Sequence, residues 1–227
     1  EFVKPMVILI VFFITSQWAG VSAVNFYSVT LMKQTLGDSV NEYLATIIMD
    51  LIRLIASIAA CVLLKRISKR ILALIGGLGT FIPLFILSGY LYFTKIYDLK
   101  NTPALLAVGL TSMIAYVFFV TAGFVTLPWN LLGELLPLAK RSTGSAIASF
   151  IAYMAVFSVV KTTPEMFQNL KPEGAFLVYG GMSFLGTVFV YTCLPETRGK
   201  TLNDIEDSGP LLIVKLKQTN NDVKKDL

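Results

Sequence analysis

The first long apolar run of the chain carries amide and hydroxyl side chains. Residues 5–31 contain no charged residue, yet they include Ser16, Gln17, Ser22 and Asn25. Such groups both donate and accept hydrogen bonds, so they suit a neutral, hydroxylated solute. Because an unsatisfied polar group is costly in hydrocarbon, these side chains either face a wet cavity or hydrogen-bond neighbouring helices. We favour the cavity for this run, with helix–helix hydrogen bonding as the alternative.

An acid and a base interrupt the run 44–64. Asp50 and Arg53 are three residues apart, a spacing that lets side chains on one helix face pair. At about 1.5 Å of rise per residue, Arg53 lies roughly 13–14 Å into the run, close to mid-membrane. An arginine there costs at least about 2.5–3.5 kcal/mol on insertion. Either Arg53 binds an anionic substrate while Asp50 holds it beforehand, or the two charges neutralise each other inside the bundle.

The chemistry of soluble and intramembrane enzymes is missing from the sequence. The chain has no histidine and two cysteines, Cys61 and Cys193, which excludes histidine triads, zinc sites with histidine ligands and a disulfide framework. Asp50 is the only carboxylate within an apolar run, so a pair of membrane aspartates is excluded as well. We therefore predict that the protein is not an enzyme and holds no metal and no cofactor.

The elements that position these side chains follow from composition. Of the 227 residues, 55% are hydrophobic and 15% charged, against about 25% charged in a typical soluble domain. A membrane helix needs roughly 20 apolar residues, and six runs meet or nearly meet that length: 5–31, 44–64, 71–94, 104–133, 142–160 and 174–194. The remaining residues cannot cover six such helices. The sequence predicts an all-α membrane protein, with a six-helix bundle over 1–194 and a tail over 195–227.

Basic residues lie at the ends of the apolar runs rather than in one patch. The formal charge is +5, and the loops on one side are richer in lysine and arginine: Lys4, Lys65, Arg66, Lys69, Arg70, Lys140, Arg141, Arg198 and Lys200. This pattern marks the cytoplasmic side. We expect a multi-pass protein of the plasma membrane with both ends in the cytoplasm, and a topological signal rather than nucleic-acid binding.

Four segments carry a family resemblance. They read QWAGVSAVNFYS at 17–28, KRISKR at 65–70, LPWNLLGELLPLAKR at 127–141 and PETRGKTL at 195–202. In this order and spacing they resemble the sugar porters of the major facilitator superfamily, and in particular the insect trehalose and facilitative sugar transporters. The resemblance implies that the chain corresponds to spans seven to twelve, one six-helix bundle of that fold, with an amino-terminal six-helix bundle as its partner.

The resemblance also implies a substrate site. Gln17 and Trp129 match the family pattern, whereas four further positions carry other residues than the family does: Ser16, Ser22, Arg53 and Thr121. All six are predicted to contact substrate. Phe26 and Tyr27 stand where the family has an aromatic gate, and interfacial belt residues are the alternative for them.

The charged residues near the basic turn are predicted to form a latch. The resemblance implies ion pairs among Arg66, Lys69, Arg70, Glu134, Arg141 and Glu196. Breaking and reforming such pairs biases inward- against outward-facing states. Solvated surface charge is the alternative.

Together these features predict transport of a small polar solute, a sugar above all, by alternating access across the lipid bilayer. Facilitative and proton-coupled mechanisms both remain open. The alternatives are a non-transporting sensor, receptor-like or degenerate relative, and a carrier of an anionic substrate that uses Arg53.

Overall fold

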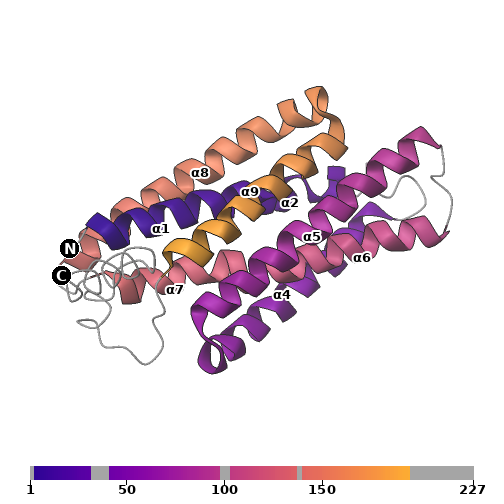
Figure 1. Cartoon of the computed structure of the whole chain (residues 1–227). Coiled ribbons are helices and arrows are strands. Elements are labelled where there is room, and N and C mark those ends of the chain that lie inside the picture. The colour runs from indigo at the N-terminus through magenta and orange to yellow at the C-terminus, as the bar shows by residue number, and fades with distance from the viewer. Residues whose placement is uncertain (1–2, 32–40, 98–102, 137–139, 195–227) are drawn as a thin grey trace, which may run out of the picture.

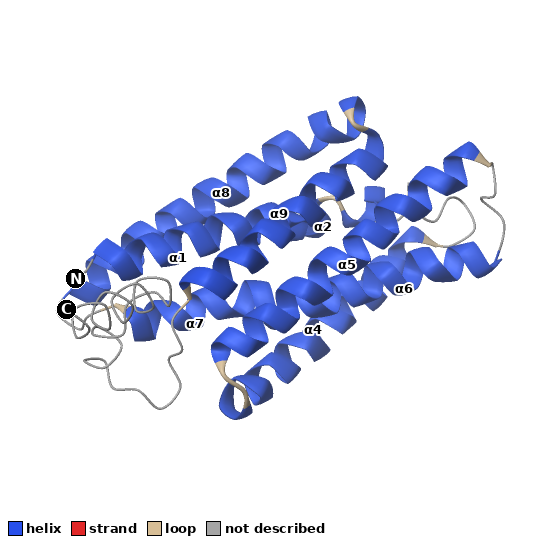
Figure 2. Cartoon of the chain, in the orientation of Figure 1, coloured by secondary structure: helices blue, strands red, loops and turns tan. Residues whose placement is uncertain are grey.

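The computed structural model describes residues 3–31, 41–97, 103–136 and 140–194, and the regular elements in these ranges are helical (Figures 1 and 2). Within the described ranges, six helical stretches are long and apolar enough to cross a membrane: Pro5–Phe26, Tyr43–Arg66, Lys69–Ile96, Leu106–Leu135, Arg141–Asn169 and Lys171–Cys193. The predicted all-α membrane fold with six spans is confirmed. The tail predicted over 195–227 lies outside the described residues.

Two of the six spans are composite. The first consists of α1 (Val3–Ser16), the π-helical segment η1 (Gln17–Val21) and α2 (Ser22–Phe26). The fourth consists of α6 (Pro103–Phe119), the π-helical segment η3 (Val120–Val125) and α7 (Thr126–Leu135). The remaining spans are single helices: α4 (Glu42–Arg66), α5 (Lys69–Ile96), α8 (Arg141–Asn169) and α9 (Lys171–Cys193).

Side-chain caps start two of the helices. The Asn41 side-chain oxygen accepts from the backbone N–H groups of Tyr43 and Leu44 at 3.1 and 3.4 Å, and so begins α4. The Ser68 hydroxyl oxygen accepts from the N–H of Ile71 at 3.3 Å and begins α5. Such caps satisfy N–H groups that lack an intrahelical partner. The Ser68 cap lies in the short turn between α4 and α5, whereas the Asn41 cap lies at the opposite end of α4.

Helix α8 is longer than the apolar run that predicts it. The uncharged run ends at Val160, whereas the helix continues through Lys161 to Asn169. A charge ends an apolar run but does not end a helix, because the backbone hydrogen-bond ladder is indifferent to side-chain charge. The added residues include Thr163, whose hydroxyl donates to the Val159 carbonyl at 2.6 Å.

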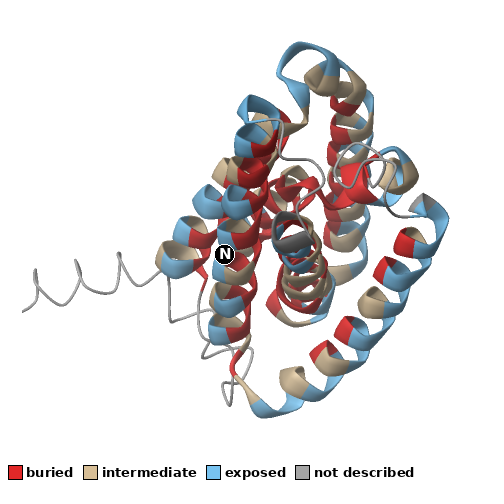
Figure 3. Ribbon diagram, turned by 90° about the vertical axis from the view of Figure 1, so that its right-hand side faces the viewer, coloured by how far each residue is buried: buried red, intermediate tan, exposed pale blue. Residues whose placement is uncertain are grey.

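The helices alternate in direction and pack around a common interior. Figure 1 shows the α4–α5 turn, the end of α7 and the start of α8 at one end of the bundle, and the α8–α9 turn at the other. Helix α5 packs mainly against α9 and α6, and buried positions face inward along each helix (Figure 3). The spans are buried to different extents. In the most apolar stretch of each, 61% of the first span is buried, whereas only 17% of α4 and 28% of α8 are.

Candidate functional site

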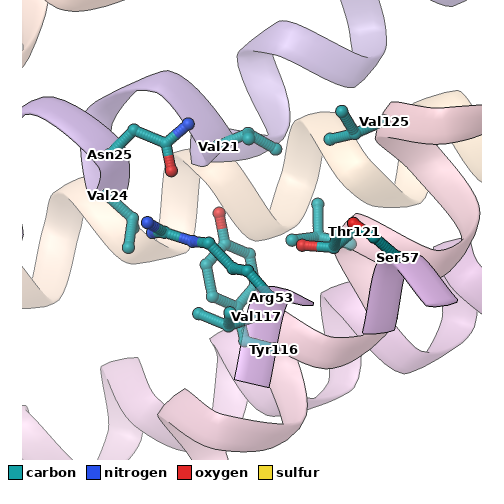
Figure 4. A pocket seen from close by; sticks show the side chains of 10 residues that line it. Val21, Val24, Asn25, Arg53, Ser57, Tyr116, Val117, Thr121 and Val125 are labelled. Atoms are coloured by element: carbon teal, nitrogen blue, oxygen red, sulfur yellow. The ribbon is translucent and has the colours of Figure 1, made fainter. Parts of the chain in front are cut away.

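A cavity of about 190 Å³ lies where three spans meet. It is bounded by η1 and α2, by α4, and by α6 and η3 (Figure 4). Its lining comprises Val21, Val24, Asn25, Arg53, Ser57, Tyr116, Val117, Val120, Thr121 and Val125. Complete small-molecule sites occupy roughly 300–1,000 Å³. The cavity therefore has the size of part of such a site rather than of a whole one.

Five of the ten residues that line the cavity are valines, and a few polar groups lie among them. Asn25 offers an amide, Ser57 and Thr121 offer hydroxyls, and Arg53 offers a guanidinium. An apolar wall with a small number of placed hydrogen-bonding groups is the usual composition of a small-molecule site. Amides and hydroxyls both donate and accept, so the wall matches a solute that carries hydroxyl groups on an apolar ring.

Arg53 forms the ion pair that its spacing predicts. One of its terminal nitrogens lies 2.6 Å from a carboxylate oxygen of Asp50, and the two side chains are 22% and 60% exposed. The Arg53 side chain extends across the cavity toward Val24 and Asn25 (Figure 4). Asp50 thus neutralises the guanidinium from outside the cavity while the guanidinium lies within it. Whether this arginine contacts substrate stays a prediction.

Three of the predicted substrate residues are not part of the cavity lining. Gln17, Ser16 and Ser22 are buried and do not line the cavity. The Ser22 hydroxyl donates to the Gln17 side-chain oxygen at 2.8 Å, and the Ser16 hydroxyl donates to the Phe13 carbonyl at 2.9 Å. Both contacts lie within the first span, and neither is a hydrogen bond to a neighbouring helix. Direct substrate contact by the three side chains stays a prediction.

The other two predicted substrate residues lie apart from each other. Thr121 belongs to η3 and lines the cavity. Trp129, in α7, packs edge-on against Phe13 with ring centroids 4.9 Å apart and lies 6.2 Å from the ring of Tyr153. It is 40% exposed but is not part of the cavity lining. A solute that touches both residues must extend along the fourth span.

The two predicted gate residues behave differently. Phe26, at the end of α2, is 67% exposed. The Tyr27 hydroxyl donates to the Val160 carbonyl of α8 at 3.2 Å. Tyr27 therefore contacts a neighbouring helix, whereas Phe26 is exposed and directly follows the cavity-lining Asn25. Their role as a gate stays a prediction.

Two of the predicted latch residues connect α5 to different helices. Lys69 forms an ion pair with Glu134 of α7. Arg70 donates to the Tyr191 carbonyl of α9 and lies over the Tyr191 ring, 5.5 Å from its centroid. Both contacts hold the end of the bundle that carries the α4–α5 turn.

The remaining latch residues are less connected. Arg66 is exposed, and within the described ranges the buried Nε atom of Arg141 has no hydrogen-bond partner. Glu196 lies outside the described residues. Among the residues that the structure does describe, no cluster of His, Cys, Asp or Glu side chains suits a metal ion. The latch as a functional device stays a prediction.

Three cavity-lining residues that carry polar groups were not among the predicted site residues: Asn25, Ser57 and Tyr116. Ser57 is four residues after Arg53 and so shares its helix face, a signal that the spacing rule offers. Asn25 stood out as a polar residue in the first apolar run but was not assigned to the site. Nothing in the sequence pointed to Tyr116, because an aromatic residue within an apolar run is ordinarily expected to be a core residue.

Comparison with known proteins identifies the family. The sequence profile of the family described as "Sugar (and other) transporter" matches residues 1–208. The chain belongs to the sugar transporter family. The prediction from four sequence segments is thereby confirmed.

Two of the relatives that this chain resembles are insect sugar transporters. The chain is 32% identical over 211 residues to the facilitated trehalose transporter Tret1 of Apis mellifera ligustica, a match that covers 92% of this chain and 41% of the relative. It is 32% identical over 203 residues to trehalose transporter 1 of Drosophila melanogaster, covering 89% of this chain and 23% of the relative. The chain thus spans less than half the length of these relatives.

Solved structures of the same family share the fold. The inward-open xylose transporter XylE from E. coli has a TM-score of 0.73 at 30% identity, with 91% of this chain and 42% of that one covered. A double tryptophan mutant of XylE has a TM-score of 0.78 at 31% identity, with 90% and 42% covered. The helical bundle is therefore a major facilitator bundle, and the protein is a multi-pass membrane protein.

Proposed function

We propose that the chain forms the carboxyl-terminal half of a carrier that moves a sugar across a membrane by alternating access. The observation that carries the proposal is the cavity between the first, second and fourth spans, with an amide, hydroxyls and a guanidinium in a valine wall. Its volume of about 190 Å³ is smaller than that of a complete small-molecule site, so in this proposal a second wall completes the site. The trehalose and xylose named for the relatives support a sugar as the solute.

The second wall belongs, in this proposal, to an amino-terminal six-helix bundle. Helices α4 and α8 are the least covered spans, and α4 supplies Arg53 and Ser57 to the cavity. Solute binds between two bundles that rock against each other, so a poorly covered helix beside the cavity suits the contact surface. We place both ends of the chain in the cytoplasm and the carrier in the plasma membrane, on the distribution of lysine and arginine in the loops.

Uptake of radiolabelled trehalose, and of xylose, into vesicles tests the proposal directly. The chain is assayed within the twelve-span carrier that contains it, or together with the amino-terminal half of the honeybee relative. We expect saturable uptake that unlabelled sugar inhibits. Sugar binding without uptake would favour the sensor alternative, and absence of both would contradict the proposal.

Thr121→Val is the sharpest variant of the cavity wall. It keeps the shape of the side chain but removes a hydroxyl that lines the cavity. A lost neutral hydrogen bond is worth about 0.5–1.5 kcal/mol, so we expect the KM for sugar uptake to rise roughly threefold to tenfold. Thr111→Val is the matched control, because Thr111 lies on the exposed face of α6 and its hydroxyl donates to the Ala107 carbonyl at 2.7 Å. Equal KM values for the two variants would show that the Thr121 hydroxyl does not bind the sugar.

Arg53→Asn tests what the guanidinium contributes. The single change leaves Asp50 without its partner at mid-membrane, so the matched variant combines Asp50→Asn with Arg53→Asn and stays neutral. If Arg53 donates to the sugar, the double variant loses about 1.5–3 kcal/mol of binding, more than tenfold in KM. Unchanged sugar uptake by the double variant would show that Asp50 and Arg53 only neutralise each other and that Arg53 does not bind the sugar. Uptake of a carboxylated sugar that disappears with Arg53 would instead favour an anionic substrate.

A further inference from the structure

The break in the first span is held by a side chain from another span. Gly20, within η1, has a φ of +88°, a left-handed conformation that interrupts the helix. The carbonyl of the residue before it, Ala19, accepts a hydrogen bond from the Tyr116 hydroxyl of α6 at 3.0 Å. Ala19 and Tyr116 are both fully buried. A polar hydroxyl buried within a membrane bundle needs an internal partner, and the Ala19 carbonyl provides it for Tyr116.

The break matters because the cavity wall begins immediately after it. Val21, Val24 and Asn25 line the cavity, and all three follow Gly20. A π turn adds one residue, which rotates the following side chains by about 100° relative to an uninterrupted helix. Any change in the geometry of the break therefore changes which residues of α2 face the cavity.

A second tyrosine contacts the same break without bonding to it. A Cβ atom on Gly20 would lie 2.9 Å from the ring of Tyr179 in α9, so this ring fills the space beside the break. The Tyr179 hydroxyl lies 2.9 Å from the hydroxyl oxygen of Thr163. Because the single Thr163 hydroxyl proton is directed to the Val159 carbonyl, Tyr179 is the donor in this pair. Its hydroxyl thus serves α8, not η1.

We propose that the Tyr116 hydroxyl is a positioning group, which fixes the break in the first span and thereby places Val24 and Asn25 in the cavity wall. In Figure 4 the Tyr116 ring lies at the back of the cavity with its hydroxyl directed toward the segment that carries Val21 and Val24. One hydrogen bond thus joins the first and fourth spans, each of which contains a π segment next to the cavity. The sugar as occupant rests on the proposed function, whereas the bond itself does not.

Thiol labelling of Val24→Cys tests the proposal without any substrate. Val24 is only 1% exposed, so a cysteine there reacts when the break opens. The native Cys61 and Cys193 are first replaced by serine, and labelling with a membrane-impermeant methanethiosulfonate is timed in vesicles that contain the full chain. Loss of one net hydrogen bond shifts an opening equilibrium by about fivefold, so we expect Tyr116→Phe to raise the labelling rate of Val24→Cys by about that factor.

Tyr179→Phe is the matched control, since it also removes one hydroxyl from a buried tyrosine beside the break. We expect it to leave the labelling rate unchanged. Asn25→Cys, at an exposed position, should label rapidly in every background and reports that the reagent reaches the site. Incorporation of 4-aminophenylalanine at position 116, which keeps an N–H donor, should return the rate toward that of the parent.

Equal labelling rates with Tyr116 and with Tyr116→Phe would overturn the proposal, as would an equal rise in Tyr179→Phe. Tyr116→Met is a second donor-free variant if the first yields no folded protein. Failure of both to fold, with Tyr179→Phe folded, would make Tyr116 a structural residue and also overturn the proposal. In the uptake assay we expect Tyr116→Phe to change KM more than the maximal rate. A labelling change without any sugar uptake would count against the proposed function alone.

Discussion

Gly76→Ala is expected to lower the thermal stability of the folded protein markedly. Gly76 of α5 and Gly123 of η3 bring two helix backbones together, and a Cβ atom on Gly76 would lie 2.5 Å from the Gly123 Cα. Overpacking costs about 1–3 kcal/mol where side chains can adjust. We expect a loss toward the upper end of that range, because the obstacle here is backbone. The thermal midpoint of the purified protein in detergent, followed by size-exclusion chromatography, measures the effect as a fall of several degrees or as aggregation.

Gly89→Ala in the same helix is the matched control. A Cβ atom at Gly89 meets no atom within 4 Å, and alanine is favoured over glycine in a helix interior by about 1 kcal/mol. The control should therefore melt at the parental temperature or slightly above it. Equal midpoints for the two variants would mean that α5 and η3 do not approach as closely as the structure shows. Close approach of backbones through small residues is a general means of helix association in membranes.

Reversal of the charge at Glu134 is expected to reduce sugar uptake at least tenfold. Glu134→Lys places two lysines side by side where α5 and α7 now form an ion pair. The Lys69 and Glu134 side chains are 18% and 44% exposed, so the pair is partly buried at the end of the bundle, and ion pairs near the surface contribute only about 0–1 kcal/mol to stability. We therefore expect the protein to fold and the conformational equilibrium between inward- and outward-facing states to shift. Initial uptake rates in vesicles, normalised to the amount of folded carrier, provide the measurement.

The double variant Lys69→Glu with Glu134→Lys separates a latch from simple surface charge. It restores the pair in the opposite sense, so uptake should return to within about threefold of the parent if the pair itself acts. Glu173→Lys is the control at the other end of the bundle, where Glu173 pairs with Lys95 of α5 at 2.6 Å. We expect it to leave uptake within about twofold. Unchanged uptake in Glu134→Lys would contradict the latch.

The sequence predicted the ion pair of α4 but not the hydrogen bond between the polar residues of the first span. Asp50 and Arg53 pair as their spacing predicts, because both lie on one continuous helix whose geometry is known in advance. Gln17 and Ser22 instead bond to each other at a separation of five residues, across η1. A spacing rule for an α-helix does not hold there, since the π segment and Gly20 change the register.

Composition and hydropathy alone determined the six spans, because a hydrocarbon layer of fixed thickness allows few other structures for such runs. The order of four segments determined the family. Only the tertiary structure decided that Asn25 and Thr121, rather than Gln17 and Trp129, line the cavity. It also decided that Tyr116 reaches Ala19, 97 residues away. The cavity lining and the Tyr116–Ala19 hydrogen bond both depend on how helices distant in sequence approach each other and rotate about their axes. The two π segments and the Gly76–Gly123 contact set this arrangement. A pattern of apolar residues in the sequence contains no information about either.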